Sequence, residues 1–190
     1  MEIKLIEIQA FKDADGIFIQ PTVVVPMEVS KFRDVGKIRP EGSPWITDGR
    51  KWHLEKRCSS ETRERFLLLD KLLQDLLELN GPKWNQKLYV AYRVNNYNWL
   101  CVQTHPNALW IDVSVKAGTF KLDTLAKELG VTEFGKDDSL SEKLALPSSV
   151  SIRNRNETTD RVRIRVKPDF NLDGAGFKKF LKEAYAQKPS

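Results

Sequence analysis

Strict alternation of apolar and polar residues marks the second half of the chain. Every second residue is apolar over 109–115, and residues 161–166 alternate Arg with Val or Ile. A period of two predicts a strand that buries one face. Strand-like runs also occupy 87–93 and 99–104, with Asn-rich and Pro-containing turns after them, and a short run occupies 150–153. Together these segments predict an antiparallel sheet.

A helical rhythm precedes these strands. Ser59 is a suitable N-cap, and leucines then recur every three or four residues until Asn80-Gly81-Pro82 ends the pattern. Additional leucines, among them Leu67 and Leu68, widen the apolar stripe. We therefore expect this helix to be buried on more than one side.

Shorter helices are predicted in the second half. One covers 122–129, and the last begins near residue 175, where Asp173 is the expected cap. A brief helical turn is predicted at 141–145. Helices that alternate with a group of adjacent strands are typical of an α+β fold, with the helices packed mainly on one face of the antiparallel sheet.

The N-terminal part has a different pattern. Residues 2–25 alternate on both sides of Asp15-Gly16, which predicts a β-hairpin that must pack on another element, because two strands alone are marginal. Residues 26–58 hold several Pro and Gly and predict an irregular connection. We therefore expect a hairpin and connection over 1–55 and an α+β domain over 56–190.

Composition narrows the class of protein. The chain has 190 residues, 41% of them hydrophobic, which excludes a largely disordered, fibrous or disulfide-stapled protein. No apolar run approaches the roughly 20 residues of a membrane span, and charges interrupt the first apolar stretch, so neither membrane association nor export is expected. A cytoplasmic chain would keep Cys58 and Cys101 reduced. Cys101 reads as a small buried apolar residue, and the basic residues before Cys58 leave open a lowered pKa for its thiol.

The sequence contains few signals of a metal site or of catalytic residues. His53 and His105 are the only histidines, and no Cys stands at ligand spacing from either. His53 forms only a weak cluster with Glu55 and Cys58. A nuclease of the restriction type would need an acid on one strand and a pattern such as Glu7-x-Gln9 on the next, yet no acid-bearing strand precedes residue 7. We therefore assign no catalytic residue, metal or cofactor, and a nuclease remnant stays the least favoured alternative.

The net charge of +5 is concentrated near the C-terminus. Residues 146–190 hold ten Lys and Arg against five Asp and Glu, which is the whole excess. Alternation places Arg161, Arg163 and Arg165 on one face of a strand, about 6.6 Å apart, where guanidinium groups match successive phosphates. Arg153 and Arg155 extend the set, and aromatic residues on neighbouring strands stack bases if they face outward. The candidate nucleic-acid-binding residues are Arg153, Arg155, Arg161, Arg163, Arg165, Tyr92 and Trp110.

Several stretches resemble a small bacterial and archaeal domain of unknown function, often labelled a predicted transport protein, that follows restriction-type nuclease modules. They are Lys87–Tyr92, Leu109–Val113, Leu125–Leu129, Arg161–Val166 and Phe177–Tyr185, within about 60–187. These motifs are packing patterns, and the first 55 residues and the 131–160 connection depart from that domain. The resemblance implies the α+β fold and a prokaryotic DNA-processing context. It carries over no catalytic residue.

The expected function is therefore a non-enzymatic binding module that contacts DNA, RNA or another polyanion through the basic strand, as an accessory to DNA processing or defence. One alternative is a protein-protein interaction or homodimerisation domain, consistent with five Trp in a polar chain. A structural alternative is a solvated strand face whose arginine stems cover Trp110 or Tyr92.

Overall fold

The computed structural model describes residues 3–13, 16–27, 42–134 and 147–189. They form two compact units, Met1–Ser43 and Pro44–Ser190. The boundary lies earlier than residue 55, because residues from Pro44 onward fold with the second unit and bury His53 and Leu54. Among the described residues, no helix combines the length and the apolar character needed to cross a membrane.

The first unit is an antiparallel pair of strands. β1 (Ile3–Asp13) pairs with β2 (Gly16–Met27), and Asp13 lies opposite Gly16, one residue earlier than a turn centred on Asp15-Gly16 would place the pairing. The register shifts between Leu5 and Ile6. Packing of this pair on another element stays a prediction.

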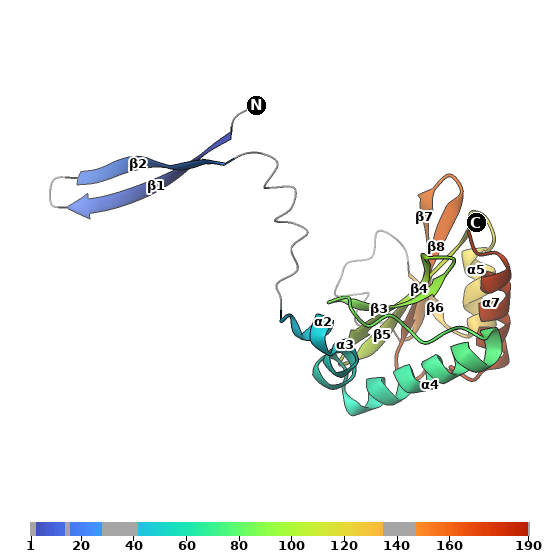
Figure 1. The fold of residues 1–190 in the computed structure, drawn as a ribbon. Coiled ribbons are helices and arrows are strands. Elements are labelled where there is room, and N and C mark those ends of the chain that lie inside the picture. The colour runs from blue at the N-terminus through green and yellow to red at the C-terminus, as the bar shows by residue number, and fades with distance from the viewer. Residues whose placement is uncertain (1–2, 14–15, 28–41, 135–146, 190) are drawn as a thin grey trace. The chain divides into compact units, whose positions relative to one another are not determined.

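The second unit contains a six-stranded sheet in the order β3-β4-β5-β8-β7-β6 (Figure 1). All neighbours are antiparallel except β6 and β7. This arrangement confirms the α+β class. The strands are β3 (Tyr89–Val94), β4 (Tyr97–His105), β5 (Ala108–Lys116), β6 (Thr132–Glu133), β7 (Ser149–Asn156) and β8 (Thr159–Val166).

Several helical segments accompany this sheet, and some correct the sequence predictions. Residues 44–57 form short helical segments, which corrects the irregular connection that the sequence predicts there. Pro44 starts the first short helix. Asp48 caps the second, because its side chain accepts a hydrogen bond from the backbone N–H of Lys51. Gly174 takes the N-cap position expected for Asp173, which pairs with Lys178 instead. The turn predicted at 141–145 lies outside the described residues. The helical elements are α2 (Pro44–Thr47), α3 (Gly49–Lys51), η1 (Trp52–Arg57), α4 (Ser60–Leu77), α5 (Leu122–Leu129) and α7 (Ala175–Ala186).

The long helix α4 has the predicted start and a narrower buried face than predicted. Ser59 and Thr62 form a reciprocal capping box, and Glu78 ends the helix at a φ of 52°. Leu69 and Leu73 are fully buried, but Leu67 and Leu68 are 39% and 46% exposed. The buried face of the helix is therefore narrower than its leucine pattern predicts.

The core lies between one face of the sheet and the helices α4, α5 and α7 (Figure 1). Alternate apolar residues of β5 and β8 are fully buried, and Phe177 and Phe180 of α7 pack together with a centroid distance of 6.1 Å. Removing each such side chain from water contributes about 1.5–3 kcal/mol. Because side chains alternate along each strand, the opposite face of the sheet carries the polar residues.

Candidate nucleic-acid interface

The sheet face turned away from the core carries the predicted arginines. Arg161, Arg163 and Arg165 of β8 lie opposite Ser114, Asp112 and Trp110 of β5. Their apolar neighbours in both strands are buried on the core side, as the alternation predicts. We call this surface the polar face. Its members are Tyr89, Arg93, Cys101, Gln103, Trp110, Asp112, Ser114, Arg161, Arg163 and Arg165.

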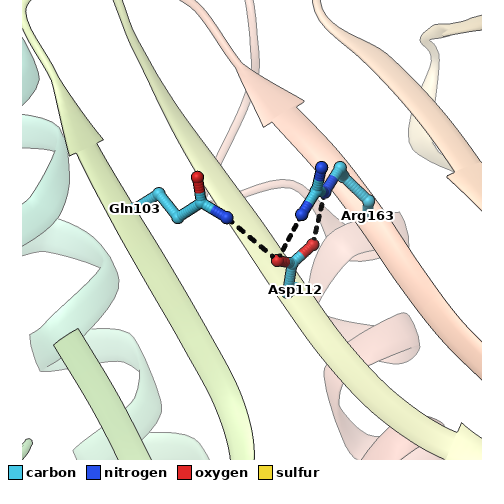
Figure 2. A network of polar contacts seen from close by, with 3 residues as sticks. All are labelled: Gln103, Asp112 and Arg163. Atoms are coloured by element: carbon cyan, nitrogen blue, oxygen red, sulfur yellow. Dashed lines mark hydrogen bonds and ion pairs between the residues drawn. The ribbon is translucent and has the colours of Figure 1, made fainter. Parts of the chain in front are cut away.

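An ion pair occupies the middle of the polar face (Figure 2). Arg163 donates from Nε to Asp112 Oδ1 at 2.6 Å and from Nη2 to Oδ2 at 2.7 Å, and Gln103 Nε2 donates to Oδ2 at 3.3 Å. Asp112 is only 5% exposed. Its hydrogen bonds raise the pKa of the Arg163 guanidinium. Arg163 is therefore committed to a carboxylate, and the Asp112 charge is neutralised.

Arg165 and Trp110 form a second cluster on this face. The guanidinium carbons of Arg163 and Arg165 lie 5.7 and 5.4 Å from the Trp110 ring centroid, and the Phe134 ring lies 6.2 Å from it. Arg165 is 3% exposed, and burial lowers its pKa. Trp110 thus serves as a packing surface for arginines, as expected if arginine side chains cover this ring instead of binding a ligand.

Tyr92 lies on the opposite face of the sheet from the arginines. It is fully buried, and its hydroxyl donates to Asp70 Oδ1 at 2.8 Å. Burial raises the pKa of this phenol. Tyr89, three residues earlier in β3, has the other parity and lies on the polar face. Tyr92 therefore leaves the candidate set, and Tyr89 enters it.

Two β-bulges shape the polar face near its edge. In the β3–β4 hairpin, Tyr92 pairs with Leu100 and Arg93 with Asn98, which leaves Trp99 as the extra residue. In the β7–β8 hairpin, Asn154 and Asn156 pair with successive residues of β8, which leaves Arg155 extra. A bulge bends its strand and re-aims a side chain.

The tips of these two hairpins approach each other. Arg155 Nη1 donates to Tyr97 Oη at 3.4 Å, although β7 and β4 are not neighbours in the sheet. The strands β5 and β8 lie between β4 and β7, so the side chains of Arg155 and Tyr97 reach across two strands to meet.

A hollow of about 430 Å³ lies on the polar face beside this contact, and we call it the arginine pocket. Arg93, Arg155 and Arg161 line it, from β3, β7 and β8 respectively. Arg93 Nη2 donates to the backbone oxygen of Asn96 at 3.0 Å. Within the described parts of the chain, none of these three guanidinium groups forms an ion pair. Asp112 is the one acid of the lining, and Arg163 neutralises it.

The structure therefore divides the predicted set. Arg155 and Arg161 meet in the pocket, and the exposed Arg153 lies beside them, opposite Arg161. Arg163, Arg165, Trp110 and Tyr92 do not line the pocket. Sequence reasoning missed Arg93, whose parity with Tyr89 in a predicted strand was the available signal.

The cysteines and the buried histidine have structural roles. Both thiols are free, and burial raises the pKa of Cys58, so the lowered value considered for it is wrong. Burial, with Asp112 nearby, raises the pKa of Cys101 in the pocket lining to about 11. His53 is fully buried; its Nε2 donates to Gln86 O and its Nδ1 accepts from the Thr104 hydroxyl, each at 2.7 Å. A neutral ring satisfies both bonds, and burial lowers its pKa.

The remaining candidate chemistry lies in the first unit. Glu7 and Gln9 are on β1, opposite Thr22 and Gln20. In the part of the chain that the structure describes, no three His, Cys, Asp or Glu side chains gather as a metal site. The nuclease alternative therefore gains no support from these residues.

Comparison with known proteins adds no relative to this picture. No protein-family model matches the chain, and neither a curated protein nor a solved structure matches it. The resemblance to the domain that follows nuclease modules stays a prediction. The function must therefore be argued from the site itself.

Proposed function

We propose that this chain is a binding module that contacts nucleic acid or another polyanion through the polar face around the arginine pocket. The supporting observation is the meeting of Arg93, Arg155 and Arg161 in one hollow, without an ion-paired carboxylate among the described residues. A guanidinium group can donate two hydrogen bonds to phosphate oxygens, and each phosphate that it neutralises releases condensed counterions from the nucleic acid. The exposed Arg153 extends this positive surface.

The proposal revises which residues contact the ligand. Arg163 organises the surface through Asp112, and Arg165 packs on Trp110, so neither is offered to a phosphate. Tyr89 and Tyr97 replace Tyr92 as the aromatic residues beside the arginines. The resemblance noted above suggests a DNA-processing context for this binding, and we propose no catalytic step.

Salt-dependent binding tests the proposal. Fluorescence anisotropy with a labelled 20-nucleotide single strand, its duplex and the matching RNA, from about 50 to 300 mM salt, gives the affinity and its salt slope. Three neutralised phosphates predict a slope near 2 for a single strand, at about 0.7 each. Arg161→Glu should weaken binding at least about tenfold and reduce the slope by about 1. No binding at the lowest salt would overturn the proposal.

Lys182→Glu is the matched control for that experiment. This substitution changes the charge by the same amount as Arg161→Glu, but on the exposed side of α7. That helix packs on the apolar face of the sheet. The affinity of this variant should stay within about twofold of the parent chain. Equal losses in both variants would show an effect of net charge alone and would remove the polar face from the proposal.

A protein partner is the second candidate. It is favoured by the adjacent Leu67 and Leu68 on α4, which are large, apolar and 39% and 46% exposed. Sedimentation equilibrium across a wide concentration range tests it through a second copy of the chain. A dimer that dissociates on Leu68→Glu would support it, and a monomer at all concentrations would exclude a homodimer.

A further inference from the structure

The arginine pocket has the size of a small-molecule site. Its volume of about 430 Å³ falls within the usual range of roughly 300–1,000 Å³ for pockets that enclose a ligand. Tyr97 and Arg155 line both this pocket and a second hollow beside Val94 and Lys188. Their hydrogen bond therefore forms a partition at one side of the pocket. A strand that passed from the pocket into the second hollow would have to break this contact.

The charge of the pocket exceeds that of one internal phosphodiester. Three guanidinium groups face the hollow, while the Asp112 carboxylate is held by Arg163. An internal phosphodiester carries a single negative charge, but a terminal phosphate monoester carries about −1.5 to −2 at neutral pH. A terminal phosphate also offers three oxygens to guanidinium donors. The pocket is therefore better matched to the end of a strand, or to a free nucleotide, than to a passing backbone.

The remaining lining suits a flat polar group attached to that phosphate. Tyr89 and Tyr97 supply aromatic rings, and every nucleobase has a face that can stack on one. Gln103 supplies a fixed amide: a carboxylate only accepts hydrogen bonds, so Nε2 must face Asp112 and Oε1 points away from it (Figure 2). This oxygen is an acceptor for an amino group on a base edge.

We infer that the arginine pocket holds one nucleotide through its terminal phosphate, with the guanidinium groups of Arg93, Arg155 and Arg161 on the phosphate and the base against tyrosine. The inference rests on the proposed function and narrows it to a strand end or a free nucleotide. Both sources share the same chemistry.

Matched oligonucleotides test this inference with the full chain. Anisotropy compares one internally labelled 12-nucleotide strand with a 5′-phosphate, a 3′-phosphate or hydroxyls at both ends, and calorimetry measures AMP and inorganic phosphate. We expect a phosphate at one end to tighten binding about tenfold, the effect of added charge-assisted hydrogen bonds. Arg161→Gln and Arg93→Gln should remove this preference, and Lys182→Gln should retain it. Circular dichroism confirms that each variant is folded.

Each outcome separates the inference from the proposed function. Strand binding that ignores the end groups overturns the inference and leaves the polar face as a backbone site. Binding of AMP with no binding of any strand supports the pocket and overturns nucleic acid as the ligand. If inorganic phosphate and AMP bind with the same affinity, the base contributes nothing, and the inference that the pocket holds a nucleotide is overturned. Absence of binding in every arm overturns both.

Discussion

Replacing Asp112 with Asn tests whether its pairing with Arg163 organises the polar face. The substitution keeps the shape of the side chain but removes its charge and presents an amide to the guanidinium donors. Removing one partner of a buried ion pair costs about 3–5 kcal/mol. The side chain of Asp112 is 6% exposed and that of Arg163 is 22% exposed. Water therefore stabilises part of the Arg163 charge that the substitution leaves without a carboxylate. We therefore expect Asp112→Asn to lower the free energy of unfolding by about 2–3 kcal/mol.

Urea unfolding followed by tryptophan fluorescence measures this loss. All five Trp belong to the Pro44–Ser190 unit, so the signal reports on the unit that contains the pair. A loss of this size lowers the midpoint by about 1–2 M urea at an unchanged slope. In a thermal scan it lowers the Tm by about 5–10 °C.

A double-mutant cycle isolates the pair itself. Arg163→Met leaves the Asp112 carboxylate without its partner and should also destabilise the chain. The double variant with Arg163→Met and Asp112→Leu removes both charges. Its loss of unfolding free energy should be clearly smaller than the sum of the losses in the single variants Arg163→Met and Asp112→Leu. A loss below about 0.5 kcal/mol for Asp112→Asn, or strict additivity in the cycle, would refute the reasoning.

Three further perturbations test the fold and the pocket. A Cβ at Gly176 would overlap the backbone oxygen of Glu128, so Gly176→Ala should lower the free energy of unfolding in urea by about 1–3 kcal/mol. Gly81→Ala, whose added Cβ meets nothing within 4 Å, should change it little, and equal effects would contradict the packing. The pKa of His53 is lowered by burial, so the unfolded state binds its proton first, and the free energy of unfolding should fall as pH drops from 6.5 toward that lowered value; the same pH dependence in His53→Gln would contradict this. Because burial raises the pKa of Cys101 to about 11, its alkylation, followed by peptide mass spectrometry, should accelerate about tenfold per pH unit from about pH 8 to 10, and a plateau near pH 9 would contradict it.

Local pattern predicted the regular elements well. The alternation over 161–166 places three arginines on one face because side chains of a strand must alternate. The cap at Ser59 and the stop after the leucine stripe follow from backbone groups that need partners within the same few residues. The helical segment over 44–57 was missed because its prolines and glycines resemble a loop and its stability comes from packing of His53 and Leu54.

The sequence by itself determined that a basic strand exists, which of its faces is apolar, and that the charge lies near the C-terminus. The tertiary structure alone decided which arginines remain offered to a ligand. The register between β5 and β8 joins Arg163 to Asp112, 51 residues away, and commits its guanidinium group to that carboxylate. The order of the strands brings Arg93, Arg155 and Arg161 to one pocket, and a bulge in each of two hairpins leaves Trp99 and Arg155 as extra residues. A bulge is defined only by the strand opposite it, so alternation within one segment cannot reveal which residue is extra.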